Sequence, residues 1–526
     1  MVDGHVEIER KVEPGPDFAV PDLTAVDGVA AVGEPVEHHL AATYFDTADL
    51  RLARAGVTLR RRTGGTDAGW HLKLPAAGHA RTEVHHPLGP RRAVPPKAVV
   101  APVLGIVRTA PVAAVAALDT TRVVTTVLAD GGRVLAEVAE DSVTGTAFAP
   151  DPGDPATVTT WREVEVELVE GDETLLDALV GALVEAGAAP SDSPSKLSRV
   201  LAHRLPEVPA ATAGTNGGRG KKGGKGKKAK PAGATAGDVV LEALRGQAAA
   251  LQAADLSVRE GAHEGVHDLR VACRRLRSIL AAFRPVLERE ATDPLREELR
   301  WVGAALSPAR DGEVALAHLR ELVEAQPVEQ VRGPVLARLR TATVKEGDAA
   351  RRATLRALTD RRYLAVLDSL DDLLASPPLA GSAGDPAGPV LAKAIHRSGK
   401  RMYARIEAAR AVHGETVGED SPLHDVRKAA KRVRYTAEVA VPVLGRPAEE
   451  LIGTMKDVQE VLGNAQDTVV TRDLCLRLGR AAGAAGEPTW TWGRLHALEE
   501  ARAASCAAEF WAQEPGLRAA VRAATR

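Results

Sequence analysis

The period of the hydrophobic pattern changes once along this chain, and this change constrains the fold more than any other feature. Over residues 1–170, apolar and polar residues alternate in short runs separated by turn signals such as Gly131-Gly132, which predicts antiparallel strands. From Val239 onward apolar residues recur at helical spacing and strand signals vanish. The sequence therefore predicts an α+β chain, with an N-terminal antiparallel β-barrel followed by an all-α domain. The alternating runs are 5–13, 57–62, 70–74, 122–128, 134–140 and 162–169.

A segment rich in Gly, Pro, Ala and Lys separates the two patterns. Residues 206–237 carry seven Lys or Arg against one acidic residue. Because this composition cannot bury a core, we predict a disordered basic linker. The predicted domains are then residues 1–205, the linker 206–237 and residues 238–526. A length of 526 residues agrees with more than one domain.

The net charge of −2 hides a division between the two halves. Residues 1–205 carry 19 basic and 29 acidic residues, whereas residues 238–526 carry 42 and 40. Neither half is basic overall and aromatic residues make up 3% of the chain, so nucleic acid is a poor candidate partner. Three scattered cysteines argue against a disulfide framework and a zinc site. With no signal-peptide pattern and no membrane-spanning run, we expect a cytoplasmic protein without a membrane partner.

Several predicted strands place like charges on one face, because residues i, i+2 and i+4 of a strand share a face. A solvated face explains any single strand of this kind, but clustered like charges on several strands need something to neutralise them. Carboxylates suit a hard divalent cation, and Arg and Lys suit phosphate oxygens. The pattern predicts a barrel with a metal at one side and a phosphate chain at the other. The residues concerned are Glu7, Glu9, Lys11, Arg60, Arg62, His71, Lys73, Glu163, Glu165 and Glu167, with Glu137 and Asp141 added if their strand stays regular.

The same residues form an ordered set of motifs. The segment Glu7-Ile8-Glu9-Arg10-Lys11 fits an ExExK signature, which is short and weak evidence alone. It is followed in order by Tyr44-Phe45-Asp46-Thr47, Leu59-Arg60-Arg61-Arg62, Lys73, Glu163-Val164-Glu165-Val166-Glu167 and Ser195-Lys196-Leu197. In this order of motifs, residues 1–205 resemble the CYTH domain, the triphosphate tunnel metalloenzyme fold.

The resemblance implies a role for each matching residue in a metal-dependent triphosphatase, a phosphoric anhydride hydrolase. Phosphate would be bound by Lys11, Arg60, Arg62, Lys73, Arg122 and Lys196. Mg²⁺ or Mn²⁺ would be held by Glu7, Glu9, Glu165 and Glu167. The catalytic set would be Glu9, Glu165 and Lys11, and a metal-bound or carboxylate-oriented water would attack without a covalent intermediate.

A charged motif occurs twice in the helical half. The spacing of 3, 4 and 3 residues places each set on one stripe of a helix. A solvated face would explain one such helix, but two matching copies indicate a duplicated helical bundle with a paired anion site. An aspartate follows each histidine at a similar interval, Asp311 in the first copy and Asp467 in the second. The two stripes are His267, Arg270, Arg274 and Arg277, then His424, Arg427, Lys431 and Arg434.

Residues 238–515 resemble the CHAD domain, a conserved-histidine α-helical domain associated with polyphosphate binding. The two His-x-x-Arg blocks and the segment from Leu462-Gly463 to Asp467 carry the resemblance. It implies two pseudo-symmetric bundles with a basic groove between them, which His396, Arg397, Lys400 and Arg401 would extend. We expect inorganic polyphosphate or triphosphate as partner, affinity that weakens steeply with salt, and association with polyphosphate granules.

Two alternatives stay open. The tunnel could grip phosphate chain ends without catalysis, in a polyphosphate-granule-binding protein. It could also belong to a nucleotide-directed enzyme of the adenylate cyclase or thiamine triphosphatase type, but the few aromatic residues in 1–205 give little support to a base pocket. The sequence does not choose between tripolyphosphate, a nucleoside triphosphate, thiamine triphosphate and long-chain polyphosphate, or between Mg²⁺ and Mn²⁺.

Overall fold

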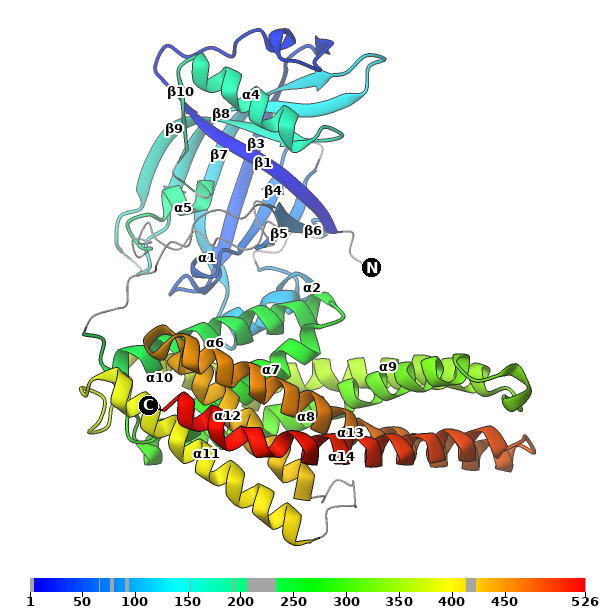
Figure 1. The fold of residues 1–526 in the computed structure, drawn as a ribbon. Coiled ribbons are helices and arrows are strands. Elements are labelled where there is room, and N and C mark those ends of the chain that lie inside the picture. The colour runs from blue at the N-terminus through cyan, green and yellow to red at the C-terminus, as the bar shows by residue number, and fades with distance from the viewer. Residues whose placement is uncertain are drawn as a thin grey trace. The chain divides into compact units, whose positions relative to one another are not determined.

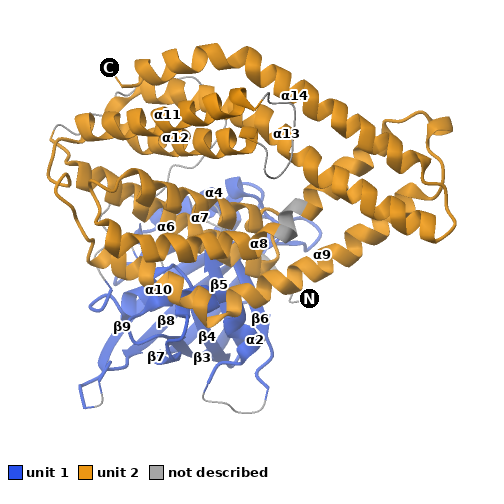
Figure 2. Ribbon diagram, turned by 90° about the horizontal axis from the view of Figure 1, so that it is seen from below, with its two compact units in different colours: residues 1–223 blue, residues 224–526 orange. Residues whose placement is uncertain are grey.

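The computed structural model describes residues 4–65, 67–75, 80–89, 94–151, 153–191, 193, 195–205, 233–412 and 422–525 (Figure 1). The chain divides into two compact units, residues 1–223 and 224–526 (Figure 2). The described strands of the sheet lie in the first unit, and the long helices follow in the second. The predicted α+β order is therefore confirmed. Most of the predicted linker, residues 206–232, lies outside the described residues, and the second unit's first helix begins at Ala236.

The strands of the first unit form one antiparallel sheet in the order β10-β1-β6-β5-β4-β3-β7-β8-β9, and β2 pairs with β7. Strand β1 pairs with β6 through Gly4–Ile8 and with β9 through Glu9–Val12. Because β1 joins the two ends of the sheet, the sheet curls into a tunnel. The bounds are β1 Gly4–Pro14, β2 Ala31–Val32, β3 Val36–Asp46, β4 Thr58–Thr63, β5 Gly69–Pro75, β6 Ala80–His86, β7 Ala113–Leu128, β8 Val134–Ala147, β9 Thr157–Leu168 and β10 Ala188–Pro190.

The alternating runs predicted from the sequence correspond to six of these strands, β1, β4, β5, β7, β8 and β9. Of the other four strands, β2 and β10 are only two and three residues long, and β3 and β6 are longer. In β3 the pairs His38-His39 and Ala41-Ala42 weaken the alternation. In β6 the run is short and mostly polar, and its pairing with β1 and β5 makes it a strand. Both strands complete the tunnel wall, so tertiary pairing decides where local pattern does not.

The outer face of β1, β8 and β9 packs on helix α4, Glu173–Glu185. Val12, Val138, Val164 and Val166 are buried there against leucines of α4. Asp172 accepts a hydrogen bond from the backbone N–H of Leu175 at 2.9 Å and so begins this helix. Since a strand's side chains alternate between faces, burying these valines outside directs the intervening charged residues into the tunnel.

The aspartate of the Tyr44-Phe45-Asp46-Thr47 motif has a structural role at the end of β3. The buried Asp46 carboxylate accepts hydrogen bonds from the backbone N–H groups of Thr47 at 2.6 Å, Leu52 at 2.9 Å and Ala53 at 2.9 Å. These bonds hold the short helix α1, Arg51–Arg54, and direct the chain into β4. The other short helices of this unit are α2 Lys97–Val100, α3 Leu104–Val107 and α5 Lys196–Val200.

The second unit consists of long helices, and its first and second parts repeat. Arg289 begins α8 and Arg446 begins α13, an offset of 157 residues that also relates His267 in α7 to His424 in α12. None of the described helices is long and apolar enough to cross a membrane. The bounds are α6 Ala236–Glu260, α7 Gly265–Ala282, α8 Arg289–Glu324, α9 Val335–Thr359, α10 Arg361–Ala375, α11 Ala387–Ala411, α12 Pro422–Leu444, α13 Arg446–Ala484 and α14 Trp490–Ala523.

Candidate functional site

A cavity of about 510 Å³ runs through the curled sheet and is lined by charged side chains. Strand register explains the lining: Lys11 lies opposite Glu165, Glu9 opposite Glu167, and Glu137 opposite Glu167 on its other side. Strand β8 stays regular through Ala139, so Glu137 and Asp141 share a face, as the sequence predicted. The charged residues that line the cavity are Glu9, Lys11, Glu34, Arg60, Arg62, Asp67, Lys73, Glu83, Arg122, Glu137, Glu165, Glu167 and Lys196.

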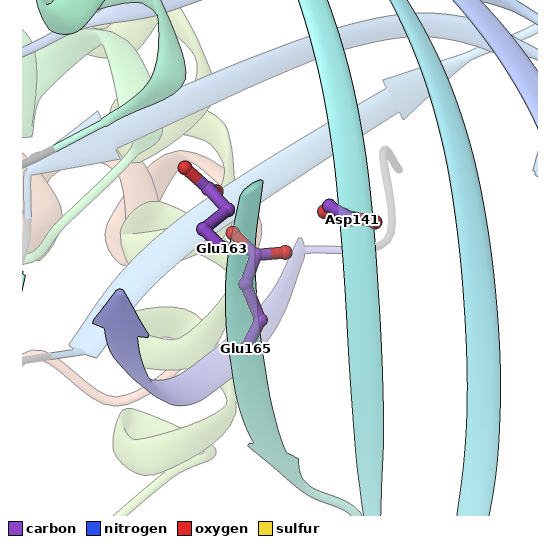
Figure 3. A group of neighbouring side chains, drawn as sticks. All are labelled: Asp141, Glu163 and Glu165. Carbon is purple, nitrogen blue, oxygen red and sulfur yellow. The ribbon is translucent and has the colours of Figure 1, made fainter. Parts of the chain in front are cut away.

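A buried carboxylate triad, Asp141, Glu163 and Glu165, lies on β8 and β9 (Figure 3). Its ligand oxygens lie within 4.8 Å of one another. Two cations offset this charge. The Nζ of Lys196 lies 2.8 Å from Asp141, 2.5 Å from Glu163 and 2.7 Å from Glu165. The Arg122 guanidinium donates to both oxygens of Asp141, at 2.8 and 2.6 Å, and also to Glu165.

Glu165 is the most strongly held carboxylate of the triad. Burial alone would raise its pKa, but Lys11, Lys196 and Arg122 together hold the pKa of Glu165 well below its ordinary value. The Nζ of Lys11 lies 2.7 Å from Glu165 and 3.5 Å from Glu9. Burial alone would lower the pKa of Lys196, and the carboxylates around it raise that pKa instead. Glu165, Lys11 and Lys196 are therefore ionised near neutral pH.

A second row of acids crosses three strands beside the triad. Glu9 on β1, Glu167 on β9 and Glu137 on β8 are cross-strand neighbours on the cavity side. Burial raises the pKa of Glu167, Lys73 opposes this, and Glu9, Glu165 and Glu137 raise it further. Repulsion of this kind is relieved by a bound cation. Glu7, predicted as a metal ligand, has its side chain outside the described part of the structure.

The cations of the opposite wall are arranged around Glu83 on β6. Its carboxylate lies 3.5 Å from Arg60 Nη2, 3.4 Å from Lys73 Nζ and 2.7 Å from Nδ1 of the buried His71. Arg62 Nη1 lies 2.5 Å from Asp67. Arg60 also lies beside the buried Tyr44, whose pKa burial would raise but Arg60 lowers. The predicted phosphate ligands Lys11, Arg60, Arg62, Lys73, Arg122 and Lys196 thus all line one cavity.

In the second unit the two predicted basic stripes approach each other where α7 packs against α12. Lys431 is at their centre. Burial first, and then the positive charges of Arg427, Arg274, Arg434 and Arg270, lower the pKa of Lys431 to about 6. The Arg274 Nε donates to the hydroxyl of Tyr435 at 2.8 Å. We call this set, Arg270, Arg274, Arg427, Lys431 and Arg434, the Lys431 cluster.

The neighbouring helices support the two ends of the Lys431 cluster. Arg270 Nη2 donates to Ser307 Oγ of α8 at 3.1 Å. Arg427 lies against Gly463 of α13, where an added Cβ would be 3.2 Å from its Nη2, so glycine permits this close approach. The Leu306 and Leu462 segments therefore run inside helices and back the basic stripes.

The remaining predicted residues of this unit are distributed differently. His267 is exposed near the start of α7. His424 is half-buried, and burial together with Lys428, Arg427 and Lys431 lowers its pKa. His396 and Lys400 are exposed on α11, and their part in the groove stays a prediction. Arg277 lies in a different charged neighbourhood, with Arg296 and Arg300 of α8.

Comparisons with known proteins agree with this architecture. The CYTH domain family model matches residues 5–200, and the CHAD domain family model matches residues 242–476. Two proteins from strains of Mycobacterium tuberculosis, both described as uncharacterized, are each 36% identical over 535 residues, which cover 99% of this chain and 98% of theirs. The chain belongs to the CYTH and CHAD families.

Two solved structures are similar to this CYTH–CHAD protein. PptA from Streptomyces chartreusis matches 54% of this chain and 100% of its own, at 20% identity and a TM-score of 0.44. The CHAD domain from the plant Ricinus communis matches 55% of this chain and 93% of its own, at 26% identity and a TM-score of 0.42.

The CYTH family is metal-dependent, and the residues of the tunnel fit a divalent cation. The triad supplies hard oxygen donors within 4.8 Å of one another, and Lys196 Nζ is the protein's own cation on the same three carboxylates. The row of Glu9, Glu167 and Glu137 supplies further oxygens on the cavity side.

Sequence reasoning missed three features of the CYTH tunnel. Glu83 belongs to a strand that the pattern did not predict, because its run is short and mostly polar. Asp141 and Glu163 were placed on charged faces but not in the metal set, because their convergence depends on the register of β8 and β9. Tyr44 was part of a motif without an assigned contact, and its pairing opposite Arg60 on β4 places it in the cavity.

Proposed function

We propose that the CYTH unit hydrolyses inorganic triphosphate or a related triphosphate with Mg²⁺ or Mn²⁺, and that the CHAD unit binds polyphosphate. One observation carries the first part: a single cavity holds a carboxylate wall on β1, β8 and β9 and a cationic wall on β4 and β5. A triphosphate needs cations along its oxygens, and its hydrolysis needs a metal that neutralises the charge developing in the transition state.

In this proposal the cationic side chains bind the phosphates. Arg60, Arg62 and Lys73 extend from β4 and β5 into the cavity and would contact the phosphates from one side. Lys11, Arg122 and Lys196 would contact them from the other side. The last three are already fixed by carboxylates at hydrogen-bond distance, so their positions are set before the substrate arrives.

The carboxylates hold the metal and orient water in this proposal. Glu9, Glu165 and Glu167, with Glu137 beside them, would hold the ion, which supplies Lewis-acid polarisation of a phosphate oxygen. Glu7 stays a predicted ligand. Glu165 stays ionised because Lys11, Lys196 and Arg122 lower its pKa, so its oxygens accept hydrogen bonds from a water next to the phosphates. Glu9 and Lys11 would complete the catalytic set.

Polyphosphate binding by the CHAD unit is supported by the Lys431 cluster. Five cations from α7 and α12 gather there, and the groups that shift the pKa of Lys431 most after its burial are all positive. Concentrated positive charge of this kind is unfavourable in the free protein and is relieved by a polyanion.

The test is phosphate release by the full-length protein from tripolyphosphate, ATP, thiamine triphosphate and long-chain polyphosphate, with Mg²⁺, Mn²⁺ or EDTA. We expect metal-dependent release from tripolyphosphate that falls at least about 100-fold in Arg60→Gln, because a charged contact to the phosphates is lost. Arg162→Gln is the matched control, since Arg162 lies outside the cavity lining and 44% of its side chain is exposed. Metal-dependent release that is unchanged in Arg60→Gln would refute the assignment. Binding of tripolyphosphate to the tunnel without release would favour the non-catalytic alternative.

A further inference from the structure

The buried His71 contacts the cationic wall of the tunnel without lining the cavity. It lies on β5, opposite Arg60 of β4 and His85 of β6, and only 3% of it is exposed. Lys73, two residues further along β5, shares its face of the strand and lines the cavity. Since His71 is not among the lining residues, it would act on a substrate through its neighbours.

Both ring nitrogens of His71 lie at hydrogen-bond distance from an oxygen. Nε2 is 2.8 Å from the backbone carbonyl oxygen of Asp67, and Nδ1 is 2.7 Å from Oε1 of Glu83. A carbonyl oxygen only accepts hydrogen bonds, so Nε2 carries a hydrogen and donates it. A neutral imidazole has one N–H, which would leave a lone pair on Nδ1 facing the carboxylate. The contact at 2.7 Å therefore requires one further proton between Nδ1 and Glu83.

The charges around Glu83 place this proton on the histidine. Glu83 Oε1 lies 3.5 Å from Arg60 Nη2, and its Oε2 lies 3.4 Å from Lys73 Nζ. Two cations at this distance favour the ionised carboxylate, and an ionised Glu83 favours the imidazolium form of His71. Asp67 adds a second carboxylate, whose Oδ2 is 4.0 Å from His71 Nε2. The pair is then an imidazolium in contact with a carboxylate.

Two more histidines face this pair. The rings of His85 and His71 meet edge-on, with 5.0 Å between their centroids. Gly69 makes room for this contact, because an added Cβ there would lie 2.1 Å from His85 Nε2. His85 is exposed, so solvent screens its charge. His5 lies opposite Glu83 in the register of β1 and β6, and its side chain is outside the described part of the structure.

The additional proton raises the net charge of the cationic wall. Among the described residues that line the cavity from β4, β5, β6 and the turn between β4 and β5, three cations face two carboxylates. This leaves one net positive charge, and an imidazolium in contact with Glu83 makes it two. A wall with twice the net charge attracts a polyanion more strongly. The lining residues counted are Arg60, Arg62, Lys73, Asp67 and Glu83.

We propose that His71 is a positioning residue of the tunnel, which keeps a proton against Glu83 and so maintains the positive charge that binds the phosphates. The inference rests on the proposed function of the tunnel and deepens it, since substrate binding then depends on a proton that no substrate contact holds. Glu83, fixed by this proton, orients Arg60 and Lys73 before the substrate arrives. Because the protonated pair binds better, affinity falls as rising pH removes the proton.

The experiment compares kcat/KM for tripolyphosphate in the full-length native protein and in His71→Gln, between pH 6 and pH 10, with Mg²⁺ or Mn²⁺. The native-to-variant ratio cancels the titration of the substrate and of every group that both proteins share. We expect a ratio of at least about fivefold at the lowest pH, mostly from KM, that declines toward one as pH rises. A ratio that is independent of pH would indicate a structural role alone and overturn the proposal.

His39→Gln is the matched control for this comparison. His39 lies on β3 outside the cavity lining, and 79% of its side chain is exposed. Its native-to-variant ratio should stay near one at every pH. A decline with pH in His39→Gln equal to that in His71→Gln would also overturn the proposal.

Glu83→Gln keeps the proposal testable if circular dichroism shows that His71→Gln does not fold. Beside a neutral amide and two cations, His71 holds no additional proton, so the native-to-variant ratio should again decline as pH rises. A constant ratio would contradict the shared proton.

Failure of the proposed hydrolysis would be seen separately, as absence of phosphate release from the native protein at every pH. Tripolyphosphate binding in EDTA is then read by calorimetry, in a Lys431→Gln background because Lys431 titrates as well. The affinity should fall with rising pH, and His71→Gln should remove this fall. An equal fall with and without His71 would overturn the inference.

Discussion

We predict that the protein takes up a proton at Lys431 when it binds polyphosphate. Burial and the surrounding arginines lower the pKa of Lys431 to about 6, so at pH 8 the free protein holds it about 99% neutral. A polyanion beside it favours the ammonium form and moves the pKa back toward its ordinary range. Binding at pH 8 should then take up about one proton, and at pH 6 about half a proton. By linkage, affinity should fall about tenfold for each unit of rising pH between 7 and 9.

Calorimetry of the full-length protein with long-chain polyphosphate, in buffers of different ionisation enthalpy, measures this uptake. Work at pH 8 keeps the contribution of His424 small, because its pKa is lowered too. Lys431→Gln should remove the uptake and flatten the pH dependence. Lys428→Gln is the matched control, a lysine of the same helix that is exposed and 3.3 Å from Asp425, and it should keep the uptake. Uptake below about 0.3 proton in the native protein, or full uptake in Lys431→Gln, would refute the reasoning.

Three further predictions follow from the same structure. Asp46→Ala should destabilise the CYTH unit by about 2–4 kcal/mol, because three backbone N–H groups lose their buried acceptor. Hydrogen exchange of β3 and β4 peptides measures this loss of stability, and unchanged exchange would contradict the prediction. Lys196→Gln should destabilise the unit, because Asp141, Glu163 and Glu165 lose the cation that they share, and Mg²⁺ should restore more of its melting temperature than it adds to the native protein. An equal effect of Mg²⁺ on both proteins would argue against this role. Arg274→Gln should reduce the slope of log affinity for polyphosphate against log salt concentration by about one unit. Titrations between 50 and 200 mM salt measure this slope. An unchanged slope would exclude Arg274 from the contact with polyphosphate.

The charged faces of the CYTH tunnel could be predicted from the sequence because they depend on strand period alone. Glu9 with Lys11, and Glu165 with Glu167, lie on the predicted face, since the neighbouring Val12 and Val166 are buried on the other side. The convergence of Lys196 on Asp141, Glu163 and Glu165 could not be predicted in the same way. It depends on the register of two strands and on a helix that follows β9 by about thirty residues, and no local pattern encodes such long-range positions.

In the helical half, too, the charged faces of single helices could be predicted from the sequence, but the packing between helices could not. The stripes of α7 and α12 could be predicted from their 3-4-3 spacing, but not the burial of Lys431 against Arg270 and Arg274, because that results from how two distant helices pack. Periodicity also separates exposed from buried positions without telling which exposed side faces a groove. Hence His396, Lys400 and Arg401 could be placed on the surface of α11, but helical spacing could not show whether they line a groove.

The most direct test of metal-dependent hydrolysis in the tunnel is the rate of phosphate release from tripolyphosphate by Glu165→Gln, with tripolyphosphate binding measured in parallel. Glu165 is buried among Lys11, Arg122 and Lys196, and the substitution keeps its shape while removing its charge. We predict a rate at least about 100-fold below that of the native protein with Mg²⁺ or Mn²⁺, and a dissociation constant that changes less than about tenfold. Glu140→Gln on the outward side of β8 should leave the rate unchanged. A native rate in Glu165→Gln would contradict the account.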